Sequence, residues 1–404
     1  MLMDSIKYAY NTFKERKMRT FLTLLGIFIG IAAVVGLISL GQGLQHVIDE
    51  QFQLMGVDKI MIIPGQSTID ITAGGNVDLT DSDLDIIRKV RGVKLATGWV
   101  YKITSVKFRD EVQYTWVTGI SLDEDKAILD SMENFEVEFG RDLQKGDRYS
   151  AVVGVRFPDA DLFEKPVGLR DKVEINGQDF KVVGIISEIG NPQDDANILI
   201  PIDVSREVLS EPEKYGVLIA QSKEGEDVSR VASDIKRKLR KFRDVEEGEE
   251  DFTVQTSEQL IESFETIFLI VQAVLIGIAA ISLFVGGIGI MNTMYTSVVQ
   301  RTPEIGVMKA IGARNSSIMT IFLIESGILG LAGGIIGIIL GVAMSKVVEI
   351  VAAQAGMSML KAYFPWYLIV GALVFSVLVG MLSGILPARQ AAKMHPVDAL
   401  RYSE

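Results

Sequence analysis

Several kinds of functional side chain are missing from this sequence of 404 residues. It has no cysteine, which excludes disulfide frameworks, thiol nucleophiles, cysteine metal sites and lipidated-cysteine anchors. Its two histidines, His46 and His395, are too far apart to indicate a metal pair. No G-x-x-x-x-G-K-[ST] phosphate loop, H-E-x-x-H or G-x-S-x-G motif occurs. We therefore expect a chain that catalyses no covalent reaction by itself and binds neither metal nor cofactor.

Lysine and arginine are absent from four long apolar runs, which are Phe21–Leu40, Ile267–Met294, Ile318–Met344 and Trp366–Leu386. Crossing the hydrocarbon core of a membrane takes about 20 apolar residues. The first run, after "KERKMR", has features of a signal peptide, but it is long for one and no A-x-A cleavage site follows it. The runs therefore predict four transmembrane helices.

Charge is distributed unevenly along the chain. Residues 47–262 hold 44 of the 52 acidic and 27 of the 40 basic residues, a net charge of −17, against +5 for the rest. This asymmetry is typical of a membrane protein with one large aqueous domain. The acidic domain would attract cationic ligands, or the charge serves solubility alone.

The short segments beside the four runs indicate the orientation in the membrane. Basic residues gather before the first run, between the second and third, and after the fourth, as Lys7, Lys14, Arg16, Lys17, Arg19, Arg301, Lys309, Arg314, Arg389, Lys393 and Arg401. Four spans place these three segments on one side, and the positive-inside rule makes that side the cytoplasm. Both termini are then cytoplasmic and the acidic domain lies outside.

The sequence of the large domain predicts an α+β fold. Short β-rich pieces such as "YKITSVKFRD" and "EVQYTWVTGI" alternate with helical patterns at 78–93 and 226–242. "NGQ" at 176–178 predicts a hairpin turn. The basic stripe Lys236–Lys241 indicates a solvated helix face and no nucleic acid partner. We expect two subdomains, with the more β-rich one near 125–205.

Both ends of this domain continue the helical pattern of the adjoining span. Leu44 and Val47 follow the first span, and Leu260 and Phe264 precede the second, as parts of apolar stripes. Two such helices could pair as a stalk, because each has a face that needs burial. Separate helices that cap the domain are an equally good interpretation.

Small and polar residues within the spans indicate where helices meet. Gly26 and Gly30 form a G-x-x-x-G pair that favours close helix approach, and dimerisation through this first span is one use of it. For the second span we expect the same packing or dimer contact at Gly286, Gly287 and Gly289. Glu325 is an intramembrane carboxylate, for which an interhelical or coupling-segment contact is favoured over a proton relay.

The loop "TPEIGVMKAIG" predicts a short cytoplasmic helix between the second and third spans. Thr302 is expected as its cap, Pro303 as its first residue and Gly312 as its stop. Glu304 would face the positive end of the helix dipole. The helical spacing of Ile305, Met308 and Ile311 predicts an apolar face that lies on the lipid surface or in a protein groove.

Three blocks of the sequence resemble a known family. "KMRTFLTLLGIFIGIAAVVGLISLGQG", "VGGIGIMNTMYTSVVQRTPEIGVMKAIGARNSSIMTIFLIES" and "GILPARQAAKMHPVDALRY" are similar to the membrane segments of the MacB/FtsX/LolE permeases of ABC transporters. The resemblance covers all four spans and implies a MacB-like periplasmic core domain between the first and second. It implies the cell membrane of a prokaryote as the location.

The resemblance also implies the partners. In this family the segment between the second and third spans holds a coupling helix that docks into the ATPase subunit. Carried over, the expected coupling residues are Arg301, Thr302, Glu304, Ile305, Gly306, Met308 and Lys309. MacB has a fused N-terminal ATPase domain, whereas this sequence begins some twenty residues before its first span. We therefore expect a separate ATPase subunit that binds ATP and Mg, and a permease homodimer.

The expected function is that of a non-catalytic permease subunit that transmits ATP-driven motion to its outer domains. The substrate class would be a peptide, drug or lipoprotein, with an extracytoplasmic adaptor or substrate protein as a further partner. The alternative is an FtsX-like membrane regulator of an extracellular cell-wall hydrolase or signalling partner. The expected segments are 1–20 cytoplasmic, 21–42 span, 43–264 outer domain, 265–294 span, 295–315 coupling segment, 316–345 span, 346–363 external loop, 364–387 span and 388–404 cytoplasmic tail.

Overall fold

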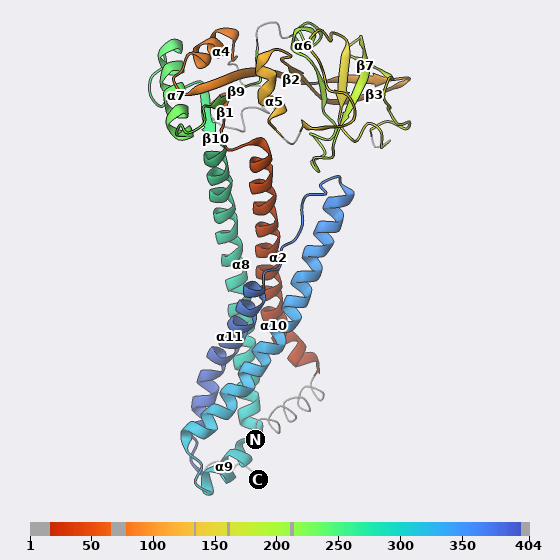
Figure 1. Cartoon of the computed structure of the whole chain (residues 1–404). Helices are drawn as coiled ribbons and strands as arrows, with labels where there is room; N and C mark the ends of the chain where they lie inside the picture. The colour runs from red at the N-terminus through yellow and green to blue at the C-terminus, as the bar shows by residue number, and fades with distance from the viewer. Residues whose placement is uncertain (1–16, 66–77, 133–134, 160–161, 211–213, 397–404) are drawn as a thin grey trace. The chain divides into compact units, whose positions relative to one another are not determined.

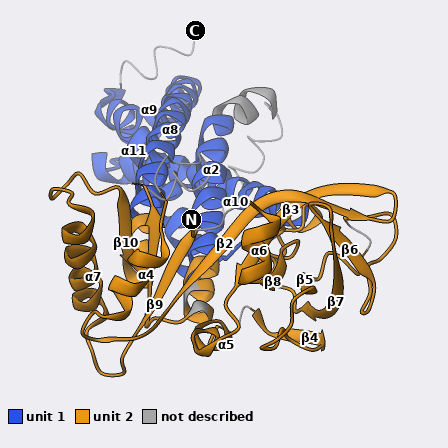
Figure 2. Ribbon diagram, turned by 90° about the horizontal axis from the view of Figure 1, so that it is seen from above, with its two compact units in different colours: residues 1–45, 266–351, 360–404 blue, residues 46–265, 352–359 orange. Residues whose placement is uncertain are grey.

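The computed structural model describes residues 17–65, 78–132, 135–159, 162–210 and 214–396. The chain divides into two compact units (Figure 2). A helical unit holds the residues up to Gln45, residues 266–351 and those from Leu360 onward. An outer unit, named for its expected location, holds residues 46–265 and 352–359.

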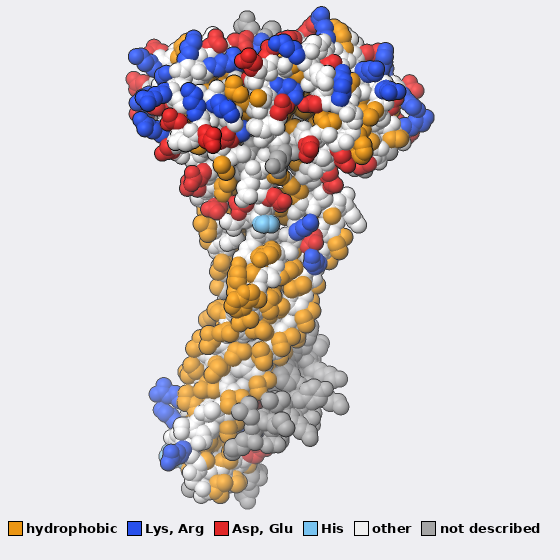
Figure 3. Space-filling view, in the orientation of Figure 1, with side chains coloured by type: hydrophobic (Ala, Val, Ile, Leu, Met, Phe, Trp, Pro, Cys, Tyr) orange, Lys and Arg blue, Asp and Glu red, His pale blue; other side chains and the backbone are white. Residues whose placement is uncertain are grey.

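Long helices make up the helical unit (Figure 1). They are α2 (Lys17–Met55), α8 (Ser257–Gln300), α10 (Asn315–Gln354) and α11 (Trp366–Lys393), with the short α9 (Thr302–Ala310) between α8 and α10. Among the described residues, these four long helices have the length and hydropathy to cross a membrane. Their exposed side chains are largely apolar (Figure 3). The chain is a multi-pass membrane protein.

The four helices are longer than the spans predicted for them. α8 begins at Ser257, eight residues before the expected start at 265, and α2 continues to Met55. α10 continues to Gln354, so the expected external loop 346–363 is helical over its first half. α11 continues to Lys393, into the expected tail. Hydropathy marks where a helix meets lipid, whereas good helix formers continue the helix beyond that point. The predicted helical continuation of the first and second spans toward the outer domain is confirmed.

Small residues bring these helices close together. A Cβ added to Gly330 of α10 would lie 2.3 Å from the Ser376 carbonyl oxygen of α11. A Cβ on Gly337 of α10 would lie 2.8 Å from the Ile31 Cβ of α2. Helices gain little from the hydrophobic effect within lipid, so such backbone contact has a large share in their packing.

The described residues of the outer unit form one mixed sheet of ten strands. Their bounds are β1 Lys59–Pro64, β2 Val93–Phe108, β3 Glu111–Ile120, β4 Val137–Gly140, β5 Ser150–Val153, β6 Lys172–Ile175, β7 Gln178–Ile186, β8 Ile198–Pro201, β9 Val217–Ser222 and β10 Phe252–Thr256. The strand order is β10-β1-β9-β2-β3-β8-β5-β7-β4, and β6 pairs with both β2 and β7. The helices are α4 Asp81–Arg88, η1 Glu124–Lys126, α5 Ala127–Asp130, α6 Ile202–Val208 and α7 Val228–Arg243. The domain is therefore α+β, as predicted.

The long strand β2 joins two parts of this domain. Its first half, Val93–Trp99, pairs with β9, and its second half, Val100–Phe108, pairs with β3. Strands β4 to β8 all fall within 125–205, the stretch expected to be β-rich. One apolar core runs through both parts, from Ile60 of β1 to Phe180 of β7, so the two parts share a hydrophobic interior.

Two local predictions for this domain, a helix within 78–93 and a hairpin turn at 176–178, are confirmed. Thr80, directly before α4, donates its backbone N–H to the Asp83 carboxylate at 2.8 Å, as in a capping box. Ile175 pairs with Gln178 across a two-residue turn. Asn176 and Gly177 both have positive φ, 46° and 88°, which is the geometry that makes Asn-Gly the preferred sequence for a tight hairpin.

An ion cluster holds α7 to the segment before α4. The Arg243 guanidinium lies 2.7 Å from the Asp83 carboxylate and 2.7 Å from that of Asp251, and it also donates to the Asp78 carbonyl oxygen. Burial of Asp83 alone would raise its pKa, but the hydrogen bonds from Arg243 and Thr80 outweigh burial and lower the pKa below 3.8. The cluster therefore stabilises the fold when Asp83 is ionised.

We predict that Arg243→Ala lowers the free energy of unfolding of this domain by about 3–5 kcal/mol, because it leaves a buried carboxylate unpaired. Arg237→Ala on the same helix is the matched control. Arg237 pairs with Asp234 at the surface, so its loss should cost under about 1 kcal/mol. Urea unfolding of the full chain in detergent, followed by the fluorescence of Trp99 and Trp116, measures both.

The effect of Arg243→Ala should also depend on pH. Because the folded pKa of Asp83 is lowered, the stabilisation is present above the ordinary carboxyl pKa of 3.8 and is lost as the pH falls through the folded pKa. The difference between wild type and Arg243→Ala should therefore shrink below pH 4. An equal difference at neutral and acidic pH would contradict this account.

Candidate functional site

The candidate site is the junction where α8 ends, α9 begins and α10 follows (Figure 1). The helical path breaks at Arg301, whose φ and ψ of −98° and 16° are not helical. The Arg301 amide still donates to the Ser297 carbonyl oxygen of α8, and its own carbonyl oxygen accepts from Ile305 of α9. One residue therefore closes one helix and caps the next.

The start of α9 differs from the prediction. Thr302 is the first helical residue and Pro303 the second, while Arg301 occupies the cap position. The Thr302 hydroxyl donates to the Val298 carbonyl oxygen at 3.2 Å. The prediction of Thr302 as the cap was wrong because α8 runs directly into the junction, so the hydroxyl binds the preceding turn of α8.

The end of α9 is as predicted. Gly312 has a φ of 93°, a left-handed conformation that glycine adopts without steric cost. The Gly312 amide donates to the Lys309 carbonyl oxygen and the Ala313 amide to that of Met308, both at 3.0 Å. These two bonds form a Schellman motif, which turns the chain sharply toward α10.

The inner face of α9 packs on the helical unit itself. Ile305 is fully buried, Gly306 is buried and Met308 is half-buried. Ile305 belongs to an apolar cluster with Val298 of α8, Phe322 of α10 and Ala391 of α11, and Met308 packs against that cluster. This part of the predicted apolar face is therefore covered by the chain's own helices.

The outer face of α9 is exposed, and it consists of Pro303, Glu304, Val307 and the C-cap residue Ile311. Val307 is 53% exposed and Ile311 81% exposed. The prediction that Ile311 shares a face with Ile305 and Met308 was wrong, because Ile311 follows Val307 by four residues and so continues the exposed side of the helix. We call these four residues the outer face of α9.

The structure therefore separates the residues expected to couple to a partner. Ile305, Gly306 and Met308 lie on the inner side of α9, and Glu304 lies on its outer face. The Lys309 ammonium donates to the Asn315 side chain at the start of α10. Val307 was missed as a site residue. Its position opposite Ile305 on the helix was the signal that could have indicated it.

Glu325 of α10 meets this junction. Its carboxylate accepts from the Arg301 guanidinium at 2.9 Å and from the Ser297 hydroxyl at 3.4 Å. The side chains of Arg301 and Glu325 are 18% and 16% exposed. The expected interhelical contact of Glu325 is thus an ion pair with the residue at which α8 gives way to α9.

Four of the five glycines singled out in the first two spans lie where helices of the same chain cross. A Cβ on Gly26 of α2 would lie 2.7 Å from Gly286 Cα of α8, and one on Gly30 would lie 2.8 Å from Leu283 Cγ. A Cβ on Gly287 would meet the Ser383 hydroxyl of α11 at 2.7 Å. Gly289 is half-buried. This glycine face of α2 is therefore used within the chain, and a dimer would need another face.

The four residues expected in a stalk lie on α2 and α8. Leu44 and Val47 are half-buried, Leu260 is 7% exposed and Phe264 is 39% exposed. Their role in a stalk stays a prediction.

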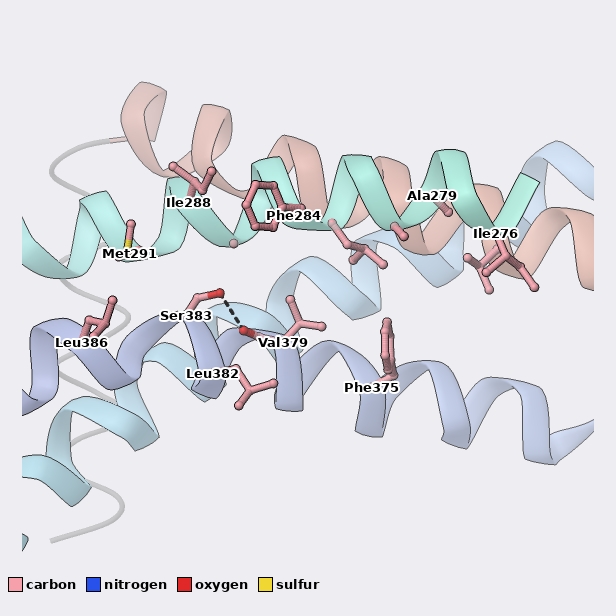
Figure 4. A pocket seen from close by; sticks show the side chains of 14 residues that line it. Ile276, Ala279, Phe284, Ile288, Met291, Phe375, Val379, Leu382, Ser383 and Leu386 are labelled. Carbon is pink, nitrogen blue, oxygen red and sulfur yellow. Dashed lines mark hydrogen bonds between the residues drawn. The ribbon is translucent and has the colours of Figure 1, made fainter. Parts of the chain in front are cut away.

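A groove of about 850 Å³ runs along α8 and α11, with Val34 of α2 in its lining (Figure 4). It extends from Ile276 to Met291 on α8 and from Phe375 to Leu386 on α11. Ser383 supplies the single polar side chain of the lining, and its hydroxyl donates to the Val379 carbonyl oxygen at 2.8 Å. The groove therefore suits hydrocarbon, from lipid or from another helix, and offers no group for ion binding or acid–base chemistry.

Metal ligands do not gather within the part of the chain that the structure describes, where no group of three or more His, Asp or Glu side chains is placed to hold an ion. The candidate site is a packed junction with an exposed helix face, formed by α8, α9, α10 and α11.

We predict that Gly286→Val disrupts the crossing of α2 and α8, because its side chain would meet backbone atoms of Gly26 and Ile27 within 3 Å. Such overpacking costs about 1–3 kcal/mol or more. Gly277→Val on the same helix is the matched control, since a Cβ there meets nothing within 4 Å. The measurement is the fraction of chain that stays monodisperse in detergent after heating. Equal losses for both variants would contradict the assigned crossing.

Two family models match the chain. A MacB-like periplasmic core domain matches residues 20–238, and an FtsX-like permease C-terminal domain matches residues 276–396. Among curated relatives, an uncharacterised ABC transporter permease of Methanocaldococcus jannaschii is 38% identical over 402 residues, which is 98% of each chain. The uncharacterised ABC transporter permease YknZ of Bacillus subtilis is 28% identical, over 99% of each chain.

Longer relatives match as well. A macrolide export ATP-binding/permease protein MacB of Aeromonas hydrophila is 30% identical over 404 residues, which is 98% of this chain and 60% of that protein. The chain therefore spans about 60% of the length of the MacB relatives. Among solved structures, the periplasmic region of MacB from Actinobacillus actinomycetemcomitans aligns with 54% of this chain and 97% of that one, at 16% identity and a TM-score of 0.44.

The two models cover most of the four spans and the outer domain, and the M. jannaschii relative matches over nearly the full length of both chains. The chain belongs to the family of ABC transporter permeases that join a MacB-like periplasmic core domain to an FtsX-like permease domain.

Proposed function

We propose that this chain is the permease subunit of an ABC transporter and couples ATP hydrolysis in a separate cytoplasmic ATPase to movement of its outer domain. ATP and Mg are bound by that partner. The observation that carries the proposal is the exposed outer face of α9, which is held from behind by a packed core.

The chemistry of the outer face of α9 suits a protein groove. Val307 and Ile311 offer apolar surface, and Glu304 offers a charge at the edge. Helices that dock in grooves present apolar anchors about one turn apart, as residues 303, 307 and 311 do. Because Ile305 and Met308 are engaged within the chain, a partner would be bound by the outer residues and supported by the inner ones.

A separate ATPase is favoured by two observations. The sequence contains no phosphate loop. The relatives in M. jannaschii and B. subtilis, which match over nearly the full length of both chains, are themselves ABC transporter permeases. In this proposal the permease forms a homodimer, so that two ATPase subunits can act as a pair.

The proposed orientation places both termini and α9 in the cytoplasm of a prokaryotic cell and the β-rich domain outside the cell membrane. The basic residues Arg301, Lys309 and Arg314 at the α9 junction support this orientation. The outer domain would carry the response to the ATPase cycle and would contact the substrate, a peptide, drug or lipoprotein, or an adaptor protein.

We predict that Val307→Asp weakens ATPase binding by about 30-fold or more, the effect of losing a central anchor worth about 2 kcal/mol. The measurement is recovery of an ABC ATPase with the full chain, purified from native membranes in mild detergent. The variant should accumulate to wild-type levels, because Val307 is 53% exposed and lies outside the apolar cluster behind α9.

Lys361→Glu is the matched control, because this exposed residue lies on the opposite side of the membrane in the proposed orientation. It should leave ATPase recovery unchanged. Full recovery with Val307→Asp, or no ATPase with the wild-type chain in any nucleotide state, would overturn the proposal. An extracellular hydrolase recovered in its place would favour the regulator function.

A further inference from the structure

Glu325 of α10 binds two residues, Ser297 and Arg301, at the end of α8. Its Oε2 accepts from Arg301 Nη1 at 2.9 Å, and its Oε1 accepts from Ser297 Oγ at 3.4 Å. Ser297 and Arg301 are four residues apart, so they lie on the same face at the end of α8. Both carboxylate oxygens of this one side chain on α10 are thus used at the same junction.

The position of Arg301 gives this contact its importance. Arg301 is the non-helical residue at which the backbone leaves α8 and enters α9. An Arg301 side chain that is fixed on α10 restricts the rotation of its own backbone, and that rotation sets the angle between α8 and α9. The Schellman motif at Gly312 fixes the other end of α9 against the start of α10.

The ion pair between Arg301 and Glu325 is largely shielded from solvent. Less than a fifth of either side chain is exposed, so water screens the attraction between the two charges only weakly. Arginine and glutamate inside or beside a membrane span pair with one another for the same reason.

We propose that Glu325 is a positioning residue that sets the orientation of α9 through Arg301, so that α9 and α10 move as one body. This proposal deepens the proposed function, because a docking helix transmits displacement only if it is rigidly joined to a membrane helix. The orientation itself does not depend on whether an ATPase binds.

The test measures the orientation of α9 directly. Because the chain has no cysteine, spin labels can be attached at Ala310→Cys on α9 and Ile335→Cys on α10 in the full chain in detergent. Both sites are exposed. We expect one narrow distance distribution for wild type, and a shifted and broadened one for Glu325→Gln. The double variant Arg301→Glu with Glu325→Arg should restore the narrow distribution.

Two controls separate positioning from general loss of structure. Glu349→Gln removes a second carboxylate of α10, which pairs with Lys346 and does not contact α9, and it should leave the distribution unchanged. Labels at Ile335→Cys and Leu382→Cys on α11 should report an unchanged distance in Glu325→Gln. An unaltered α9 distance in Glu325→Gln overturns the proposal. The proposal is also overturned if the charge swap does not give the narrow wild-type distance distribution. This second outcome can be read even if Glu325→Gln does not accumulate.

A second readout connects positioning with coupling. In the complex with the ATPase, Glu325→Gln should keep ATPase recovery and lose the ATP-dependent change in distance between labels on the outer domains. The charge swap should regain that change. If the wild-type chain recovers no ATPase, the proposed function fails while the α9 distances still decide the role of Glu325. If Glu325→Gln responds fully to ATP, the positioning role is overturned.

Discussion

A carboxylate on a membrane helix needs a partner, and the partner of Glu325 determines how α9 is held. Arg301 supplies the opposite charge, and it is also the residue at which α8 ends and α9 begins. The charge of Glu325 on α10 is therefore balanced by Arg301, the residue that joins α8 to α9. Behind α9, Ile305 and Phe322 close the apolar cluster, so the short helix is anchored by both charge and packing.

Backbone contact between helices makes this anchorage rigid. Gly26 and Gly286 join α2 to α8, and Gly330 and Gly380 join α10 to α11. Helices that approach this closely are in backbone contact along their crossing. In the proposed function, this contact is what would carry motion of α9 into the bundle. Packing is incomplete at the groove between α8 and α11, whose apolar lining suits lipid or another helix.

Much of this architecture could be predicted from the sequence, because spans, hairpin and helix stop depend on local patterns. The left-handed Gly312 and the Asn176–Gly177 turn are examples, since few other residues fit those conformations. The faces of α9 could not be assigned, because periodicity reveals an apolar stripe without showing what covers it. The partner of Glu325 lies 24 residues away, beyond any local pattern.

The most direct test of the central claim is a photo-crosslinking scan of α9 in native membranes, with the reactive side chain placed in turn at Glu304, Ile305, Val307, Met308 and Ile311. The account predicts cross-links to an ABC ATPase from positions 304, 307 and 311. It predicts cross-links within the permease from 305 and 308, which lie on the inner face. ATPase cross-links from the inner positions, or only lipid adducts from the outer ones, would contradict it.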